Sequence, residues 1–141
     1  MIKVELFEQI DNAVLNSVLK SDAEVANYQF ITDDGETYLI ANTATGDDAY
    51  VDDVTFAAGE YLNGYNVKAW EGQKLVIDDK HIAYASGKTY ADIVAGTTLL
   101  KVADSGKLEV ADVAPASGVY FKVTDKCRLT GNAVKAKVVI A

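Results

Sequence analysis

The feature that most constrains the fold is an alternation of apolar and polar side chains through most of residues 25–141. Near the C-terminus, for example, Val134 and Ala136 alternate with Lys135 and Lys137. Successive side chains of a β-strand point to opposite faces, so a two-residue period predicts strands with one buried and one solvated face. The same period recurs in short stretches along residues 25–141. We therefore expect one β domain there.

Turn-forming residues separate these stretches. Asp33-Asp34-Gly35, Asp104-Ser105-Gly106 and Thr130-Gly131-Asn132 each stand between two strand-like stretches. Asp, Asn and Gly favour tight hairpins because they tolerate positive φ angles at low cost. The spacing predicts about eight to ten short antiparallel strands, arranged as a small β-sandwich or barrel.

Two phrases repeat the same order of parts. Residues 58–79 read AGEYLNGYNVKAWEGQKLVIDD and residues 95–112 read AGTTLLKVADSGKLEVAD. Each places Ala-Gly before a leucine, then a second glycine, then Lys-Leu. We expect each copy to form a β-hairpin behind a kinked entry strand, with glycine where the backbone bends. Duplication and chance convergence on one hairpin pattern remain alternative origins.

The N-terminal segment follows a different spacing. Ile10, Val14 and Val18 recur every fourth residue, which predicts a short helix with one apolar face. We expect residues 1–24 to form an N-terminal arm that contains this helix.

Charge and composition exclude several partners. The 141 residues carry a formal net charge of -8, whereas a nucleic-acid site requires clustered Lys and Arg. No apolar run is long enough for a membrane span, and the first residues do not resemble a signal peptide. We therefore expect no nucleic acid and no membrane as partners, and a cytoplasmic site of synthesis. The single cysteine, Cys127, cannot form an internal disulfide and is expected to point inward.

No residue pattern predicts catalysis. The only histidine, His81, follows Asp78-Asp79-Lys80 and is expected to lie in a surface turn. Neither Ser86 nor Ser105 lies in a Gly-x-Ser-x-Gly turn that would expose a nucleophile. We expect no enzyme and no catalytic residue.

Metal and cofactor signals are also weak. Paired aspartates at 33–34, 47–48, 52–53 and 78–79 would suit calcium, but the spacing of an EF-hand loop is missing. Turn-forming aspartates explain these pairs, and calcium stays an alternative. One cysteine and one histidine do not suffice for zinc. With no glycine-rich phosphate loop, we expect no metal and no cofactor.

Aromatic residues offer a candidate binding patch. Tyr61, Tyr65 and Trp70 lie within ten residues of one another. Tyrosine and tryptophan are common on partly solvated surfaces that bind a partner, and they also pack in cores beneath sheets. The alternatives are thus a recognition patch, a carbohydrate platform or a part of the core.

Three stretches resemble small, acidic, β-rich virion proteins of tailed bacteriophages, the capsid decoration or head-associated structural proteins. They are GETYLIANTATGDDAYVDDVTFAAGEYLNGYNVKAWEGQKLVIDDKHI (35–82), YADIVAGTTLLKVADSGKLEVAD (90–112) and GVYFKVTDKCRLTGNAVKAKVVIA (118–141). The resemblance implies a non-enzymatic protein that binds the major capsid protein of a phage and decorates or stabilises the head. It also suggests that the protein forms a homotrimer and that it is located in the virion, which is assembled in the host cytoplasm.

The docking surface follows as a hypothesis. The apolar residues of the N-terminal arm do not follow the alternating pattern of the predicted core. We therefore expect Ile10, Val14 and Val18 to contact the partner. Tyr61, Tyr65 and Trp70 complete the candidate set. Two other functions stay open: another phage structural component (head fibre base, tail or baseplate), and a carbohydrate-binding β-sandwich module.

Overall fold

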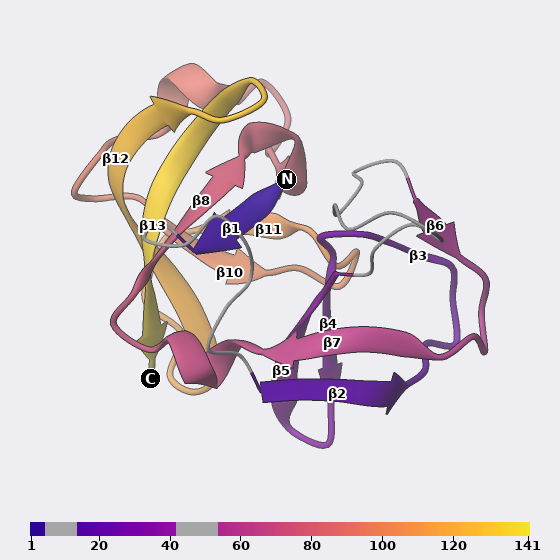
Figure 1. The fold of residues 1–141 in the computed structure, drawn as a ribbon. Coiled ribbons are helices and arrows are strands. Elements are labelled where there is room, and N and C mark those ends of the chain that lie inside the picture. The colour runs from indigo at the N-terminus through magenta and orange to yellow at the C-terminus, as the bar shows by residue number, and fades with distance from the viewer. Residues whose placement is uncertain (5–13, 42–53) are drawn as a thin grey trace.

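A computed structural model describes residues 1–4, 14–41 and 54–141, whose regular secondary structure consists mainly of β-strands (Figure 1). The strands form a seven-stranded sheet, a four-stranded sheet and a two-stranded ribbon. Helical structure in the described ranges is confined to three short 3-10 helices, η1 (Val67–Trp70), η2 (Asp79–His81) and η3 (Tyr90–Asp92). The predicted all-β class is confirmed.

The seven-stranded sheet has the order β1-β8-β13-β12-β10-β11-β9. All neighbours are antiparallel except β11 and β9, which run parallel. A β-bulge between Val123 and Asp125 interrupts the register of β12 against β13. The strands are β1 (Ile2–Val4), β8 (Lys74–Asp78), β13 (Asn132–Ile140), β12 (Val119–Arg128), β10 (Leu99–Val102), β11 (Leu108–Ala111) and β9 (Ile82–Ala83).

The four-stranded sheet has the order β2-β7-β5-β4 and is antiparallel throughout. Beside it, β3 and β6 form the two-stranded ribbon. The strands are β2 (Val14–Leu19), β7 (Leu62–Asn66), β5 (Glu36–Ile40), β4 (Phe30–Asp33), β3 (Val25–Ala26) and β6 (Thr55–Phe56).

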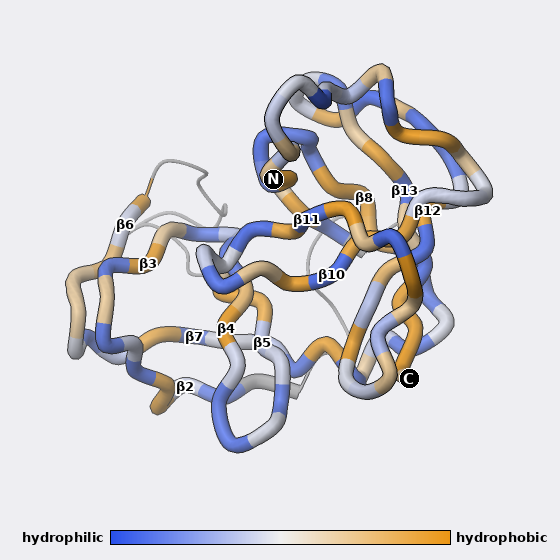
Figure 2. The backbone as a smooth tube through the Cα atoms, turned by 180° about the vertical axis from the view of Figure 1, so that it is seen from behind, coloured by the Kyte–Doolittle hydropathy of each residue, from blue (hydrophilic) through white to orange (hydrophobic). Residues whose placement is uncertain are grey.

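The main core draws side chains from both larger sheets. Phe30 of β4 and Phe121 of β12 contact each other with ring centroids 5.6 Å apart, and both are buried. A smaller apolar cluster lies within the four-stranded sheet and the ribbon (Figure 2). Its buried members are Leu19, Val25, Ile40 and Leu62. Burial of these inward faces is the favourable term that drives the sheets together.

Three hairpins form at the predicted turns. At the first, Asp34 and Gly35 take φ angles of 50° and 77°, the left-handed pair that a tight two-residue hairpin needs. The longer turns after β10 and β12 also connect antiparallel neighbours. The prediction of these hairpins is confirmed.

The turn of the β10–β11 hairpin also joins the two larger sheets. The Phe30 N–H donates to the Gly106 carbonyl at 2.8 Å. A Cβ on Gly106 would lie 3.2 Å from the Phe30 carbonyl oxygen, and the residue has a φ of +86°. Glycine is required here by both the close approach and the backbone conformation.

The predicted N-terminal helix is wrong. Val14–Leu19 forms strand β2, which pairs antiparallel with β7, and β1 pairs with β8. The four-residue spacing also fits a strand, and β-branched residues such as valine favour strands. Pairing with β7 supplies hydrogen-bond partners for backbone groups of β2. Ile10 lies outside the described residues. Within the expected arm, residues 1–24, the structure places Ile2–Val4 and Val14–Leu19 in sheets.

The two copies of the repeated phrase fold differently. The second forms the β10–β11 hairpin as predicted. The first does not form a hairpin, because β7 belongs to the four-stranded sheet and β8 to the seven-stranded sheet. Between them lies η1, whose first turn is capped by the Asn66 side chain, which accepts from the Lys68 N–H at 3.0 Å. Burial of Val67 and Trp70 fixes this crossover.

Candidate functional site

A buried polar cluster surrounds Asp78 at the end of β8. This carboxylate is only 2% exposed. Its Oδ1 accepts from the backbone N–H groups of Thr130 (3.0 Å) and Gly131 (3.3 Å), and its Oδ2 accepts from the Thr130 hydroxyl and from the ammonium of Met1 (3.0 Å). Burial raises the pKa of Asp78, but the hydrogen bonds and the charge of the ammonium outweigh it and hold the pKa below the usual value. The cluster ties β1 and the β12–β13 turn to β8.

His81 belongs to the same cluster, so its prediction as a surface-turn residue is wrong. The side chain is 8% exposed, and its Nε2 lies 2.9 Å from the Met1 nitrogen. The ring of Tyr28 contacts it, with centroids 5.4 Å apart. The burial of His81 follows from these contacts with Met1 and Tyr28, which lie far from it in the sequence. The contacts of the histidine connect buried elements of the fold.

Two tyrosines near this region act as hydrogen-bond donors. The Tyr84 hydroxyl donates to Asp79 at 3.3 Å, and burial together with that carboxylate raises the pKa of Tyr84 above its ordinary value. The Tyr90 hydroxyl donates to the Ala133 carbonyl at 2.7 Å. The first contact joins Tyr84 to η2, and the second anchors η3 to β13 of the large sheet.

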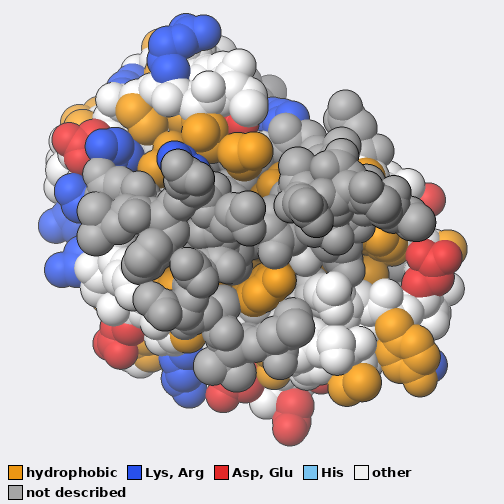
Figure 3. All heavy atoms as spheres, in the orientation of Figure 1, with side chains coloured by type: hydrophobic (Ala, Val, Ile, Leu, Met, Phe, Trp, Pro, Cys, Tyr) orange, Lys and Arg blue, Asp and Glu red, His pale blue; other side chains and the backbone are white. Residues whose placement is uncertain are grey.

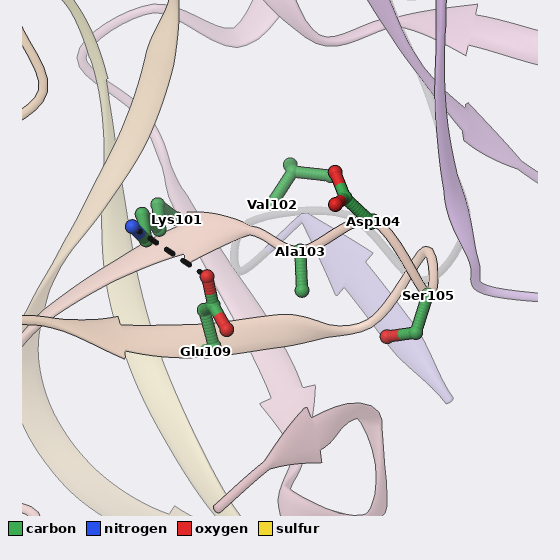
Figure 4. A pocket seen from close by; sticks show the side chains of 6 residues that line it. All are labelled: Lys101, Val102, Ala103, Asp104, Ser105 and Glu109. Carbon is green, nitrogen blue, oxygen red and sulfur yellow. Dashed lines mark ion pairs between the residues drawn. The ribbon is translucent and has the colours of Figure 1, made fainter. Parts of the chain in front are cut away.

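Three surface cavities lie on or near the β10–β11 hairpin. The first, of about 510 Å³, is lined by both strands of the hairpin (Figure 4). Its one ion pair joins Lys101 and Glu109 at 3.5 Å, and both side chains are more than 40% exposed, so solvent screens the pair. The second, of about 280 Å³, lies between Phe30 of β4 and Val102 of β10.

The third cavity, of about 380 Å³, lies beside η3 and has a mixed lining. Tyr84, Ile93 and Val110 contribute apolar surface, and Lys88 and Asp92 contribute charge. Thr89 also lines this cavity, and the Asp92 carboxylate accepts from the Thr89 N–H at 2.8 Å, so both side chains cap the start of η3.

The predicted partner-binding residues separate into different environments. Val18 and Tyr61 are exposed, by 69% and 66%. Tyr61 precedes Leu62, which pairs with Leu19, and the ammonium of Lys20 lies 4.3 Å from the Tyr61 ring centre. Because strand residues alternate, Val18 shares the outer face of the sheet with Lys20 and Tyr61. Apolar side chains gather there, at the lower right of Figure 3.

The remaining predicted residues do not join this surface. Trp70 is 0% exposed and lies in the main core, and Tyr65 is partly buried against that core. Val14 begins β2. The tyrosines and Trp70 therefore do not form one exposed aromatic platform, which a carbohydrate ligand would need for stacking.

Sequence reasoning missed a row of lysines on the outer face of the large sheet. Lys74, Lys137 and Lys122 lie directly opposite one another on β8, β13 and β12. The alternation at Lys135 and Lys137 predicted a solvated strand face, but which strands adjoin β13 is a non-local property. Like charges at directly opposed positions of a sheet destabilise it, so the row calls for an explanation.

Within the described ranges, no three His, Cys, Asp or Glu side chains come together in a group that could hold a metal ion. The acidic pairs at 47–48 and 52–53 lie outside those ranges. No helix in them has the length and apolar character to cross a membrane. Cys127 forms no disulfide and is only half-buried, on β12.

Comparison with protein-family models, with curated proteins and with solved structures found no match for this chain.

Proposed function

We propose that this chain is a structural protein of a tailed-bacteriophage virion that binds the lattice of the major capsid protein and decorates or stabilises the head. The resemblance of its β-rich phrases to head-associated virion proteins supports this function. We further propose that the two larger sheets form a small β-sandwich, since a shared core joins them. Such a body suits a protein that clamps a shell and performs no chemistry.

The observation that carries the docking role is the exposed edge of the four-stranded sheet. Within the described residues β2 pairs with β7 alone, and its six residues, VLNSVL, carry no charge. Edge strands that stay unpaired are usually protected by charges, because they offer a template for another chain. The exposed Val18 and Tyr61 flank this edge and supply apolar contact area. Together they suit a protein partner that covers the edge and the outer face beside it.

Shell binding tests the proposal directly. Empty expanded shells of the major capsid protein of the proposed phage would be mixed with the purified chain, pelleted and imaged for added density. We expect stoichiometric binding by the native chain and at least about tenfold weaker binding by Val18→Lys combined with Tyr61→Ala, because a central apolar contact is removed.

Val113→Lys is the matched control. Val113 is 77% exposed and lies outside the four-stranded sheet, so its replacement adds the same charge at a distant surface. Binding by the control at the native level supports the β2 edge as the docking surface. Failure of the native chain to bind shells, together with binding to purified tails or baseplates, would assign it to another part of the virion.

Deletion of residues 1–20 would remove the segment that the sequence predicts to contact the partner, but the result could not be interpreted. It removes both β1 and β2, and with them the buried side chains of Ile2 and Leu19. Loss of binding would then follow from loss of the sheets.

A further inference from the structure

The charges of this chain are divided unevenly between its two larger sheets. Residues 14–41 and 54–66, which form the four-stranded sheet and the ribbon, contain six acidic residues and one lysine, a formal charge of -5. Residues 67–141, which form most of the large sheet, contain eight acidic and eleven basic residues, a formal charge of +3. The overall charge of -8 therefore conceals one acidic and one basic region.

The basic region has an ordered centre, the lysine row of Lys74, Lys137 and Lys122. Neighbouring strands are about 4.8 Å apart, so the three side chains span roughly 10 Å across β8, β13 and β12. Lys74 forms one exposed ion pair, with Asp125 at 3.5 Å. Among the described residues, no carboxylate pairs with Lys122 or Lys137, and both are exposed. Lys and Arg side chains gather along this margin of the molecule, at the left of Figure 3.

In the acidic region, two carboxylates lie at the tip of a hairpin. The hairpin between β4 and β5 extends from the sheet and carries Asp33 and Asp34 at its turn (Figure 2). Both carboxylates are exposed, and in the described part of the chain neither one forms an ion pair. Glu36, directly opposite Asp33, already pairs with Lys68 at 3.3 Å. The turn therefore presents two exposed carboxylates whose charge is opposite to that of the lysine row.

We infer that two copies of this chain associate head to tail, with the Asp33–Asp34 turn of one copy docked on the lysine row of the next. Three adjacent lysines cost stability in the isolated sheet, and carboxylates placed among them would remove that cost. The complementary surfaces are different patches of the same molecule, so the contact is heterologous. It closes into a ring, a trimer included, if the rotation between copies permits, and otherwise continues as an open chain.

Sedimentation velocity of the full chain tests this inference. Association through exposed charges is strong at about 0.01 M salt, where the screening length is roughly 30 Å, and weak at about 1 M, where it is roughly 3 Å. We expect the native protein to form dimers or larger species that dissociate as salt rises. A protein that remains monomeric at low salt and high concentration would overturn the inference.

Charge-swapped variants identify the surfaces. Lys122→Glu combined with Lys137→Glu should weaken self-association by more than about tenfold, and so should Asp33→Lys combined with Asp34→Asn. Asparagine is chosen at position 34 because its φ of 50° is tolerated by Asn. A mixture of the two double variants should associate again, since each supplies the surface that matches the other.

A matched control replaces two exposed lysines outside the row, Lys88→Glu with Lys107→Glu, and should associate like the native protein. Equal loss in this control, or no recovery in the mixture, would overturn the inference. Binding of a short DNA duplex by a monomeric chain, lost in the Lys122 and Lys137 variant, would also overturn it, because the row would then serve a polyanion. A monomer that still binds shells would contradict this inference alone and leave the proposed docking through Val18 and Tyr61 intact.

Discussion

Replacing Asp78 by asparagine tests the physical account of the buried polar cluster. Asparagine has nearly the same shape, but only one of its two terminal atoms is an acceptor. With the oxygen facing the Thr130 and Gly131 N–H groups, the amide nitrogen faces the Thr130 hydroxyl and the Met1 ammonium. Two hydrogen bonds to a charged acceptor are lost, and each contributes about 1.5 kcal/mol or more, so the free energy of unfolding should fall by about 3 kcal/mol at pH 7.

The pH dependence provides a second, independent signature. The pKa of Asp78 is lower in the folded chain than in the unfolded chain, because the hydrogen bonds and the ammonium outweigh the effect of burial. The stability that the ionised group contributes is therefore fully present above the unfolded pKa of about 4, and it is lost as the pH falls through the lower folded pKa. The difference between the native chain and Asp78→Asn should be constant from pH 7 to about pH 5 and shrink below about pH 4.

Urea unfolding, followed by the fluorescence of the single tryptophan and by circular dichroism, measures both effects. Asp112→Asn is the control, since Asp112 is exposed and should change stability by less than about 0.5 kcal/mol. A double-mutant cycle with Thr130→Val should show coupling between the hydroxyl and the carboxylate. A loss below about 1 kcal/mol for Asp78→Asn, or a loss that does not change with pH, would refute this account.

Two further substitutions test the packing of the small sheet and the main core. Gly64→Ala should lower stability by about 2–3 kcal/mol, since its Cβ would lie 2.3 Å from Leu19 Cδ1 and 3.0 Å from Tyr38 Cβ, whereas Gly131→Ala, with open space around it, should leave the thermal midpoint unchanged. Trp70→Ala should cost at least about 3 kcal/mol in chemical denaturation, because the indole is fully buried, and Tyr61→Ala at the exposed edge should cost less than about 0.5 kcal/mol. A comparable loss in each control would contradict the assigned burial.

Local chemistry made the strands and several turns predictable. The alternation with Lys135 and Lys137 placed Val134 and Ala136 on a buried face, where the structure has them. The Asp34-Gly35 hairpin was predictable because positive φ angles depend on the residue itself. These features need no knowledge of distant parts of the chain.

The candidate docking surface was predictable only in part. Val18 and Tyr61 were expected to meet a partner and are exposed, but Trp70, expected beside them, is buried. An aromatic residue in a short sequence window gives no sign of which side of a sheet it will occupy when a crossover such as η1 intervenes. The lysine row was invisible for the same reason, since its three members come from strands far apart in sequence.

The sequence by itself determined that this chain forms β-strands and where its tight hairpins turn. It also determined which side chains of the strands within residues 118–141 face inward. Tertiary structure alone decided that residues 14–19 form a strand, that the first copy of the repeated phrase crosses between sheets, and that His81 is buried. The physical reason is that side-chain alternation and turn conformation are properties of neighbouring residues. Strand partners, and therefore burial and the grouping of charges, depend on hydrogen bonds between segments distant along the chain.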